Sequence, residues 1–168
     1  MLETKTVSEI INHLKSKDIS IKEVIEYYLN NIEKLNPKIN SIVSIKNKRE
    51  IIEEAEKKSN TKFYGLPIAV KDLSDVVGFP TTYGYPGTKN YNPKKNSLFV
   101  DKLLKAGITI IGKTNTAELG VGGQTINRLF GPTSNVYDIS KCAAGSSGGA
   151  STAVASGMLP FADGTDQM

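Results

Sequence analysis

The 168-residue sequence contains a single cysteine, Cys142, which excludes an internal disulfide and a metal site built from cysteines. It also contains a single histidine, although most metal sites and Ser-His-Asp triads depend on histidine. That residue, His13, falls beside the apolar stripe of a predicted amphipathic helix, so we expect a solvent-facing side chain rather than a catalytic one. The sequence therefore predicts no metal site.

Arginine is scarce as well: only Arg49 and Arg128 stand among 21 basic residues, and the net charge of +4 is spread along the chain. Because arginine is the preferred residue for bidentate phosphate recognition, direct nucleic-acid binding is not expected. No apolar run reaches the roughly 18 residues of a membrane span. The first ten residues carry two acids and no apolar signal core, which predicts a cytoplasmic protein.

Residues 1–60 predict mainly helices. The second helix should end at Asn36-Pro37, since the residue before proline avoids helical geometry. Residues 39–45 alternate like a strand, and 48–59 form a charged helix. We expect residues 1–60 to pack on the core without forming a site. Two capping boxes mark helix starts: Thr6 with Glu9, and Ser20 with Glu23.

Residues 61–168 alternate between strand and helix patterns. Buried strands are predicted at Leu66 to Val70 and at Ile108 to Ile111. The helix between them should stop at Gly107, and a helix of small residues follows near position 150. This order predicts an α/β fold with a mixed, partly parallel sheet flanked by helices.

The stretch "GITIIGKT", Gly107 to Thr114, formally matches a phosphate-binding loop. We reject that interpretation because its four middle residues are Ile, Thr, Ile and Ile. These β-branched residues favour an extended strand over a tight anion-binding turn, and Gly112 should mark the end of the strand. Lys113 and Glu118 could either support a site structurally or lie on the surface.

The stretch "KCAAGSSGGAST", residues 141–152, places two serines inside a glycine cluster. A serine nucleophile needs a base, and without histidine the candidate is lysine. Lys71 is distinctive because it ends the apolar run "GLPIAV". Burial would lower its pKa and make it neutral enough to accept a proton. On the residues alone, a structural lysine at a strand end is an equally good interpretation.

Five ordered blocks make the chain resemble the amidase signature family, which includes bacterial-type amidases and the A subunit of glutamyl-tRNA amidotransferase. The resemblance implies a Ser-cis-Ser-Lys triad, with the lysine at Lys71 and the bridging serine at Ser146. Ser147 would be a structural hydroxyl in the same turn. Three glycines, Gly145, Gly148 and Gly149, would shape that turn. The blocks are "GLPIAVKD", "AGITIIGKTNTAELG", "FGPTSNVYD", "AAGSSGGASTAVASG" and "PFADGTD".

The chain departs from the family pattern at Ala144 and Ala150, where the family often has glycine and serine. A larger departure follows Asp166. The family's nucleophilic serine lies in a segment like "GTDxGGS", so its counterpart would fall two positions beyond Met168. Gln167 and Met168 would begin the oxyanion loop, whose N–H groups stabilise the tetrahedral intermediate. We therefore expect residues 61–168 to be the N-terminal part of the amidase signature domain, and the chain alone to be inactive.

The resemblance implies hydrolysis of a carboxamide C–N bond without a metal or an organic cofactor. The substrate would be a small-molecule amide, or glutamine whose ammonia passes to amidotransferase partner subunits. The alternative is a truncated, catalytically inactive fragment or a binding module of the same fold. Self-association through an open sheet edge is also expected, because unpaired edges pair with other chains.

Overall fold

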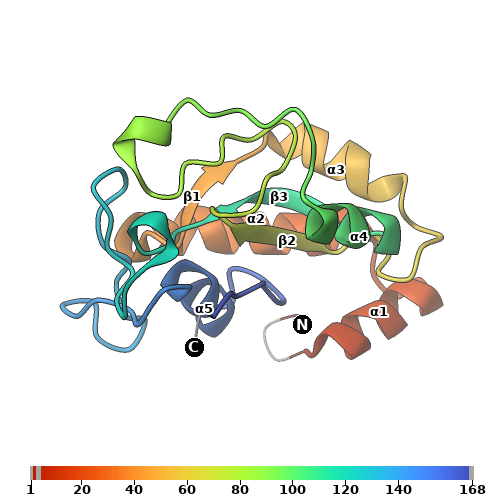
Figure 1. The fold of residues 1–168 in the computed structure, drawn as a ribbon. Helices are drawn as coiled ribbons and strands as arrows, with labels where there is room; N and C mark the ends of the chain where they lie inside the picture. The colour runs from red at the N-terminus through yellow and green to blue at the C-terminus, as the bar shows by residue number, and fades with distance from the viewer. Residues whose placement is uncertain (1, 3–4, 167–168) are drawn as a thin grey trace.

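A computed structural model describes residue 2 and residues 5–166 (Figure 1). None of the helices in this described part is long and apolar enough to cross a membrane. Two short 3-10 turns, η1 and η2, interrupt the long connections. The elements in chain order are α1 Val7–Ser16, α2 Ile21–Ile39, β1 Ile42–Ile45, α3 Lys48–Glu56, β2 Pro67–Lys71, η1 Pro86–Thr88, α4 Leu98–Ala106, β3 Thr109–Thr114, η2 Glu118–Gly120 and α5 Gly148–Ala155.

The three strands form one mixed sheet in the order β1-β3-β2. β2 runs parallel to β3, with Lys71 opposite Thr114, and β1 runs antiparallel to β3. The predicted α/β fold with a partly parallel sheet is therefore confirmed, and residues 1–60 contribute a strand to it. The division of the chain at residue 60 stays a prediction.

The N-terminal helices begin where the two capping boxes predict. Both boxes are formed, by Thr6 with Glu9 and by Ser20 with Glu23. The predicted end of the second helix at Asn36-Pro37 was wrong, because α2 continues through Pro37 to Ile39. The buried side chain of Ile39 favours this last turn, and Asn36 Oδ1 then accepts from the backbone N–H groups that follow the helix.

The central strand β3 is longer than the sequence predicted, which corrects the expected end at Gly112. Its residues are all buried between β1 and β2, so backbone pairing carries the strand on to Thr114. A Cβ at position 112 would lie 2.2 Å from the Ser44 carbonyl oxygen, which explains a glycine inside the strand. The extended backbone of 109–114 also agrees with rejecting a phosphate loop.

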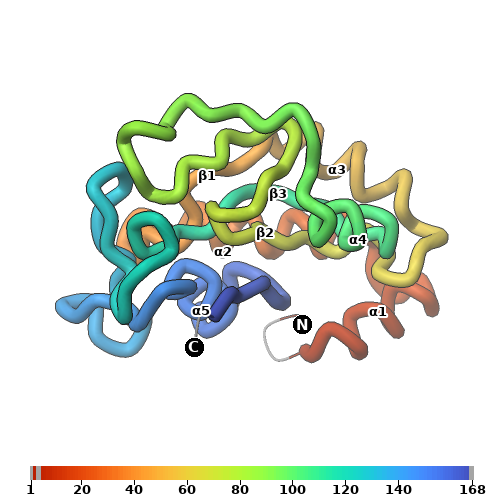
Figure 2. Tube along the Cα trace, viewed as in Figure 1, coloured from red at the N-terminus to blue at the C-terminus, as the bar shows by residue number. Residues whose placement is uncertain are grey.

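Helices cover both sides of this small sheet. α5 contacts all three strands and lies below them in Figure 1, whereas α3 lies above and contacts β3. Two long connections, residues 72–97 and 115–147, leave the carboxyl ends of the parallel strands (Figure 2). Open α/β sheets commonly bind ligands at that end, and the predicted site residues lie there.

Candidate active site

Lys71 is the last residue of β2, and its side chain is fully buried. Its Nζ lies 2.7 Å from Ser146 Oγ and 2.6 Å from Thr165 Oγ1. The predicted contact between Lys71 and Ser146 is thus present in the structure. Burial lowers the pKa of Lys71, and the nearby carboxylates of Asp163 and Asp166 oppose this effect.

Ser146 lies in a turn held between two parts of the chain. The peptide bond that joins it to Gly145 is cis. The Ser146 carbonyl oxygen accepts from Ala117 N at 3.0 Å and from Thr116 Oγ1 at 3.2 Å. These bonds fix the backbone of the turn to the segment that follows β3, so the hydroxyl of Ser146 is directed at Lys71.

The glycines of this turn lie close to neighbouring parts of the chain. A Cβ at Gly145 would lie 2.8 Å from backbone atoms of Gln124. At Gly149 it would lie 2.4 Å from Asn115 N. The backbone N–H of Gly148 donates to Thr125 Oγ1 at 2.7 Å. Close approach of backbone accounts for glycine at positions 145 and 149, and close approach of the Thr125 side chain accounts for it at position 148.

Ser147 contacts the segment that follows α5. Its Oγ accepts from Thr165 N at 3.1 Å and lies 3.3 Å from the Thr165 carbonyl oxygen. The hydroxyl is therefore engaged with backbone, and its structural role stays a prediction. Asp166 is exposed and acts on Lys71 through its charge. The predicted start of the oxyanion loop, Gln167 and Met168, lies outside the described residues.

Two residues of the site were missed by the sequence reasoning. Thr165 contacts the Lys71 amine, and Asp163 Oδ1 accepts from Lys71 N at 2.8 Å. Both lie in "PFADGTD", a block that carried the family resemblance. Residue spacing and periodicity in a polar turn do not predict a contact to a residue about 90 positions earlier. Only the presence of the family block could therefore have indicated Asp163 and Thr165.

Lys113 and Glu118, left open by the sequence, have different surroundings. Lys113 is fully buried, with its Nζ 3.1 Å from Asp72 Oδ1 and 2.8 Å from the Ser74 carbonyl oxygen. Burial lowers the pKa of Lys113, and Asp72 opposes that effect. Lys113 pairs with Val70 in the sheet register, so its side chain lies on the opposite face from Lys71. Glu118 instead forms a surface ion pair with Arg128.

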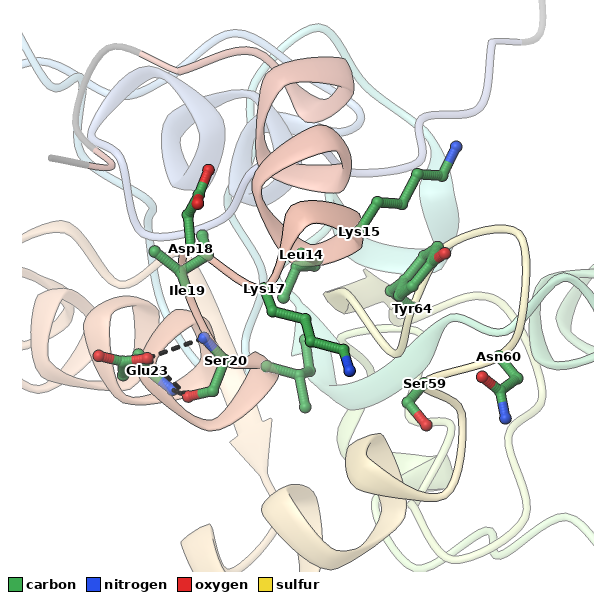
Figure 3. Close-up of a pocket in the computed structure, with 11 residues that line it drawn as sticks. Leu14, Lys15, Lys17, Asp18, Ile19, Ser20, Glu23, Ser59, Asn60 and Tyr64 are labelled. Atoms are coloured by element: carbon green, nitrogen blue, oxygen red, sulfur yellow. Dashed lines mark hydrogen bonds between the residues drawn. The ribbon is translucent and has the colours of Figure 1, made fainter.

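A pocket of about 650 Å³ lies away from these residues, beside the connection between α1 and α2 (Figure 3). It contains none of the predicted site residues. Its Glu23 carboxylate is already bound by Ser20 in the capping box, as the dashed lines show. His13, on the nearby helix α1, is partly exposed and pairs with Asp18 at 3.1 Å. Within the described ranges no three metal-ligating side chains come together.

Comparison with known proteins shows which family the chain matches. The amidase family model matches residues 23–167. The A subunit of the glutamyl-tRNA(Gln) amidotransferase of Methanosarcina barkeri is 40% identical over 156 residues, which is 90% of this chain and 32% of that protein. An acylamidase of Rhodococcus erythropolis is 36% identical, over 96% of this chain and 35% of the acylamidase.

A solved structure supports the same assignment. A bacterial aryl acylamidase of the amidase signature family superposes with a TM-score of 0.87 at 31% identity, over 96% of this chain and 35% of that one. The chain spans about a third of the length of the curated relatives it matches. Sequence and fold agree, and the chain belongs to the amidase signature family.

Proposed function

We propose that this chain supplies the base and the proton relay of an amide hydrolase, with Lys71 as base and Ser146 as relay. The observation that carries the proposal is the 2.7 Å contact between a fully buried lysine amine and a serine hydroxyl. A lysine accepts a proton only when neutral, and burial lowers the pKa of Lys71 in the required direction.

In the proposed reaction, neutral Lys71 takes the proton of Ser146 while Ser146 takes the proton of a nucleophilic serine. The nucleophile attacks the amide carbonyl carbon and forms a tetrahedral intermediate. The C–N bond then breaks, and the proton returns through Ser146 to the leaving nitrogen. Water attacks the resulting acyl ester, releasing the carboxylic acid and restoring the serine. No step requires a metal or an organic cofactor.

The nucleophile and the oxyanion loop belong to the positions after Asp166 in the family pattern. We propose a small carboxamide or glutamine as substrate. With glutamine, the ammonia would pass to partner subunits of a glutamyl-tRNA amidotransferase, as the names of several relatives suggest. The cytoplasmic location expected from the N-terminus stays a prediction. The alternative function is a binding module that retains this part of the fold without catalysis.

A chimera tests the proposal. Residues 1–166 are joined to the part of the Rhodococcus erythropolis acylamidase that follows its matching aspartate, and release of amine from an anilide is measured. Lys71→Ala and Ser146→Ala should each lower kcat by about 10⁴- to 10⁶-fold, the range seen for loss of one triad member in a serine hydrolase. Lys105→Ala, which removes an exposed lysine of α4, serves as the matched control and should retain full activity.

The outcomes separate the two functions. An active chimera whose turnover survives Lys71→Ala or Ser146→Ala would contradict the role assigned to that residue. A folded chimera without any turnover would favour the binding module.

A further inference from the structure

Asp163 is a carboxylate beside the proposed base for which the mechanism above has no role. It lies in the irregular segment after α5, and its Oδ1 accepts the backbone N–H of Lys71 at 2.8 Å. Burial disfavours the charged form of this side chain and raises the pKa of Asp163 above its ordinary range. A carboxylate at this position beside Lys71 suggests a role that a neutral side chain would not perform.

The first part of that task follows from the topology. β2 is an outer strand of the described sheet and pairs with β3 alone. Asp72 N donates to the Thr114 carbonyl oxygen of β3, so the N–H of the preceding residue, Lys71, is directed away from β3. Asp163 provides the acceptor for this N–H. It thereby holds the residue whose side chain must reach Ser146.

The contact belongs to a short clamp formed by residues 163–165. Asp163 binds the backbone of Lys71, and Thr165 Oγ1 binds its amine at 2.6 Å. Thr165 N in turn donates to Ser147 Oγ at 3.1 Å, next to the relay serine. Residues 163–165 therefore fix the lysine and the serine turn relative to each other.

The second part of the task is electrostatic. The charges that act on Asp163 are Lys71 on β2 and Lys113 on β3, and those that act on Lys71 are Asp163 and Asp166. Of these two carboxylates, Asp163 opposes the effect of burial on the Lys71 amine more strongly. Its negative charge thus stabilises the protonated amine, which makes the neutral amine a stronger base.

We propose that Asp163 is a positioning residue for Lys71, whose carboxylate anchors the lysine backbone at the end of β2 and places a negative charge near the buried amine. This inference rests on the proposed function for its relevance to catalysis, but its test does not require turnover. The measured quantity is the pKa of Lys71 in the 168-residue chain, obtained by NMR titration of the lysine Cε resonances. Lys71→Arg identifies the resonance by its loss.

Two substitutions separate the hydrogen bond from the charge. Asp163→Asn keeps an oxygen acceptor but loses the charge, so the pKa of Lys71 should fall by about one unit. Asp163→Leu loses both, so the pKa should fall similarly and the Lys71 amide should also exchange faster with solvent. Asp138→Asn, which removes an exposed carboxylate paired with Lys141, should change neither quantity.

A folded Asp163→Asn chain whose Lys71 pKa equals that of the parent would overturn the electrostatic role. Unchanged amide exchange in Asp163→Leu would overturn the anchoring role. If both variants unfold, Asp163→Glu and the parent remain informative, because ionisation of the carboxylate at position 163 must shift the Lys71 Cε resonance during the titration. Absence of that shift contradicts the proposal. The proposed function fails separately, if the Lys71→Ala chimera keeps its turnover.

Discussion

Burial of Lys71 has a consequence for stability that depends on pH. The folded state lowers the pKa of Lys71 below its ordinary value of 10.5, so the unfolded chain binds the proton more readily. The resulting loss of stability is absent above pH 10.5 and grows as pH falls toward the folded-state pKa. The free energy of unfolding of Lys71→Met minus that of the parent should therefore be larger at pH 7 than at pH 11.

Urea unfolding of both chains at the two pH values measures this difference. For Lys105→Met, at an exposed position, the difference in free energy of unfolding from the parent should be the same at pH 7 and pH 11. A Lys71→Met chain that is relatively less stable at pH 7 than at pH 11 would mean that folding raises the pKa of the lysine.

Gly149 and Gly123 provide a matched pair of glycine substitutions. A Cβ at Gly149 would lie 2.4 Å from Asn115 N and 2.7 Å from the Ser41 carbonyl oxygen, and backbone atoms cannot move aside cheaply. At Gly123 it would meet nothing within 4 Å. Gly149→Ala should thus cost about 3 kcal/mol or more of stability, whereas Gly123→Ala should be tolerated. Equal denaturation midpoints for the two variants would contradict this account of the glycine cluster.

At this scale the sequence predicted the residues with a strong local signature. Lys71 ends an apolar run and the pair Ser146-Ser147 lies in a glycine cluster, so the local pattern singled them out. The choice of Lys71 as base and of Ser146 as relay came from the resemblance to the amidase signature family. Asp163 and Thr165 were not singled out, because a turn brings them to Lys71 from a part of the chain about 90 positions later, and no local pattern marks such a contact. The buried environment of Lys113 was equally hidden, since a lysine in the sequence gives no indication that Asp72 lies opposite it.

Among the elements, the starts of helices and the positions of buried strands were predictable, whereas the ends of helices and strands were less so. Side-chain caps and apolar runs are local signals, and they placed the start of α2 and the strand β2. The ends of α2 and β3 depend on tertiary contacts: burial of Ile39 in one case, pairing on both sides of the strand in the other. Local sequence propensity predicts neither of these tertiary contacts.

The strand β3 also allows a test of the Lys113–Asp72 pair. Removing one partner of a buried ion pair leaves an uncompensated charge, so Lys113→Ala should destabilise the chain by about 3–5 kcal/mol. Arg128→Ala, which breaks the exposed pair with Glu118, should have little effect because water screens that pair. Chemical denaturation compares the free energies of unfolding of the two variants. Similar losses would show that the buried Asp72 carboxylate does not depend on Lys113.

The whole molecule exposes several large apolar side chains on its loops and helix starts. Leu98, Val121, Tyr137 and Ile139 are each more than 60% exposed. β2 is also an outer strand of the described sheet, and unpaired strand edges favour association, so the isolated chain should self-associate or bind a complementing chain. Light scattering over a range of concentrations measures the mass in solution. A monodisperse monomer at all concentrations would contradict the expectation.

The central claim, that Lys71 is the base of an amide hydrolase, is tested most directly by the pH profile of kcat/KM in the active chimera. Protonation of the base abolishes its function, so kcat/KM should fall as pH decreases through the pKa of Lys71 measured in the same chimera by NMR. In the Asp163→Asn chimera both values should move together to lower pH. An acid limb that does not follow the Lys71 pKa, or that persists in Lys71→Ala, would contradict the claim.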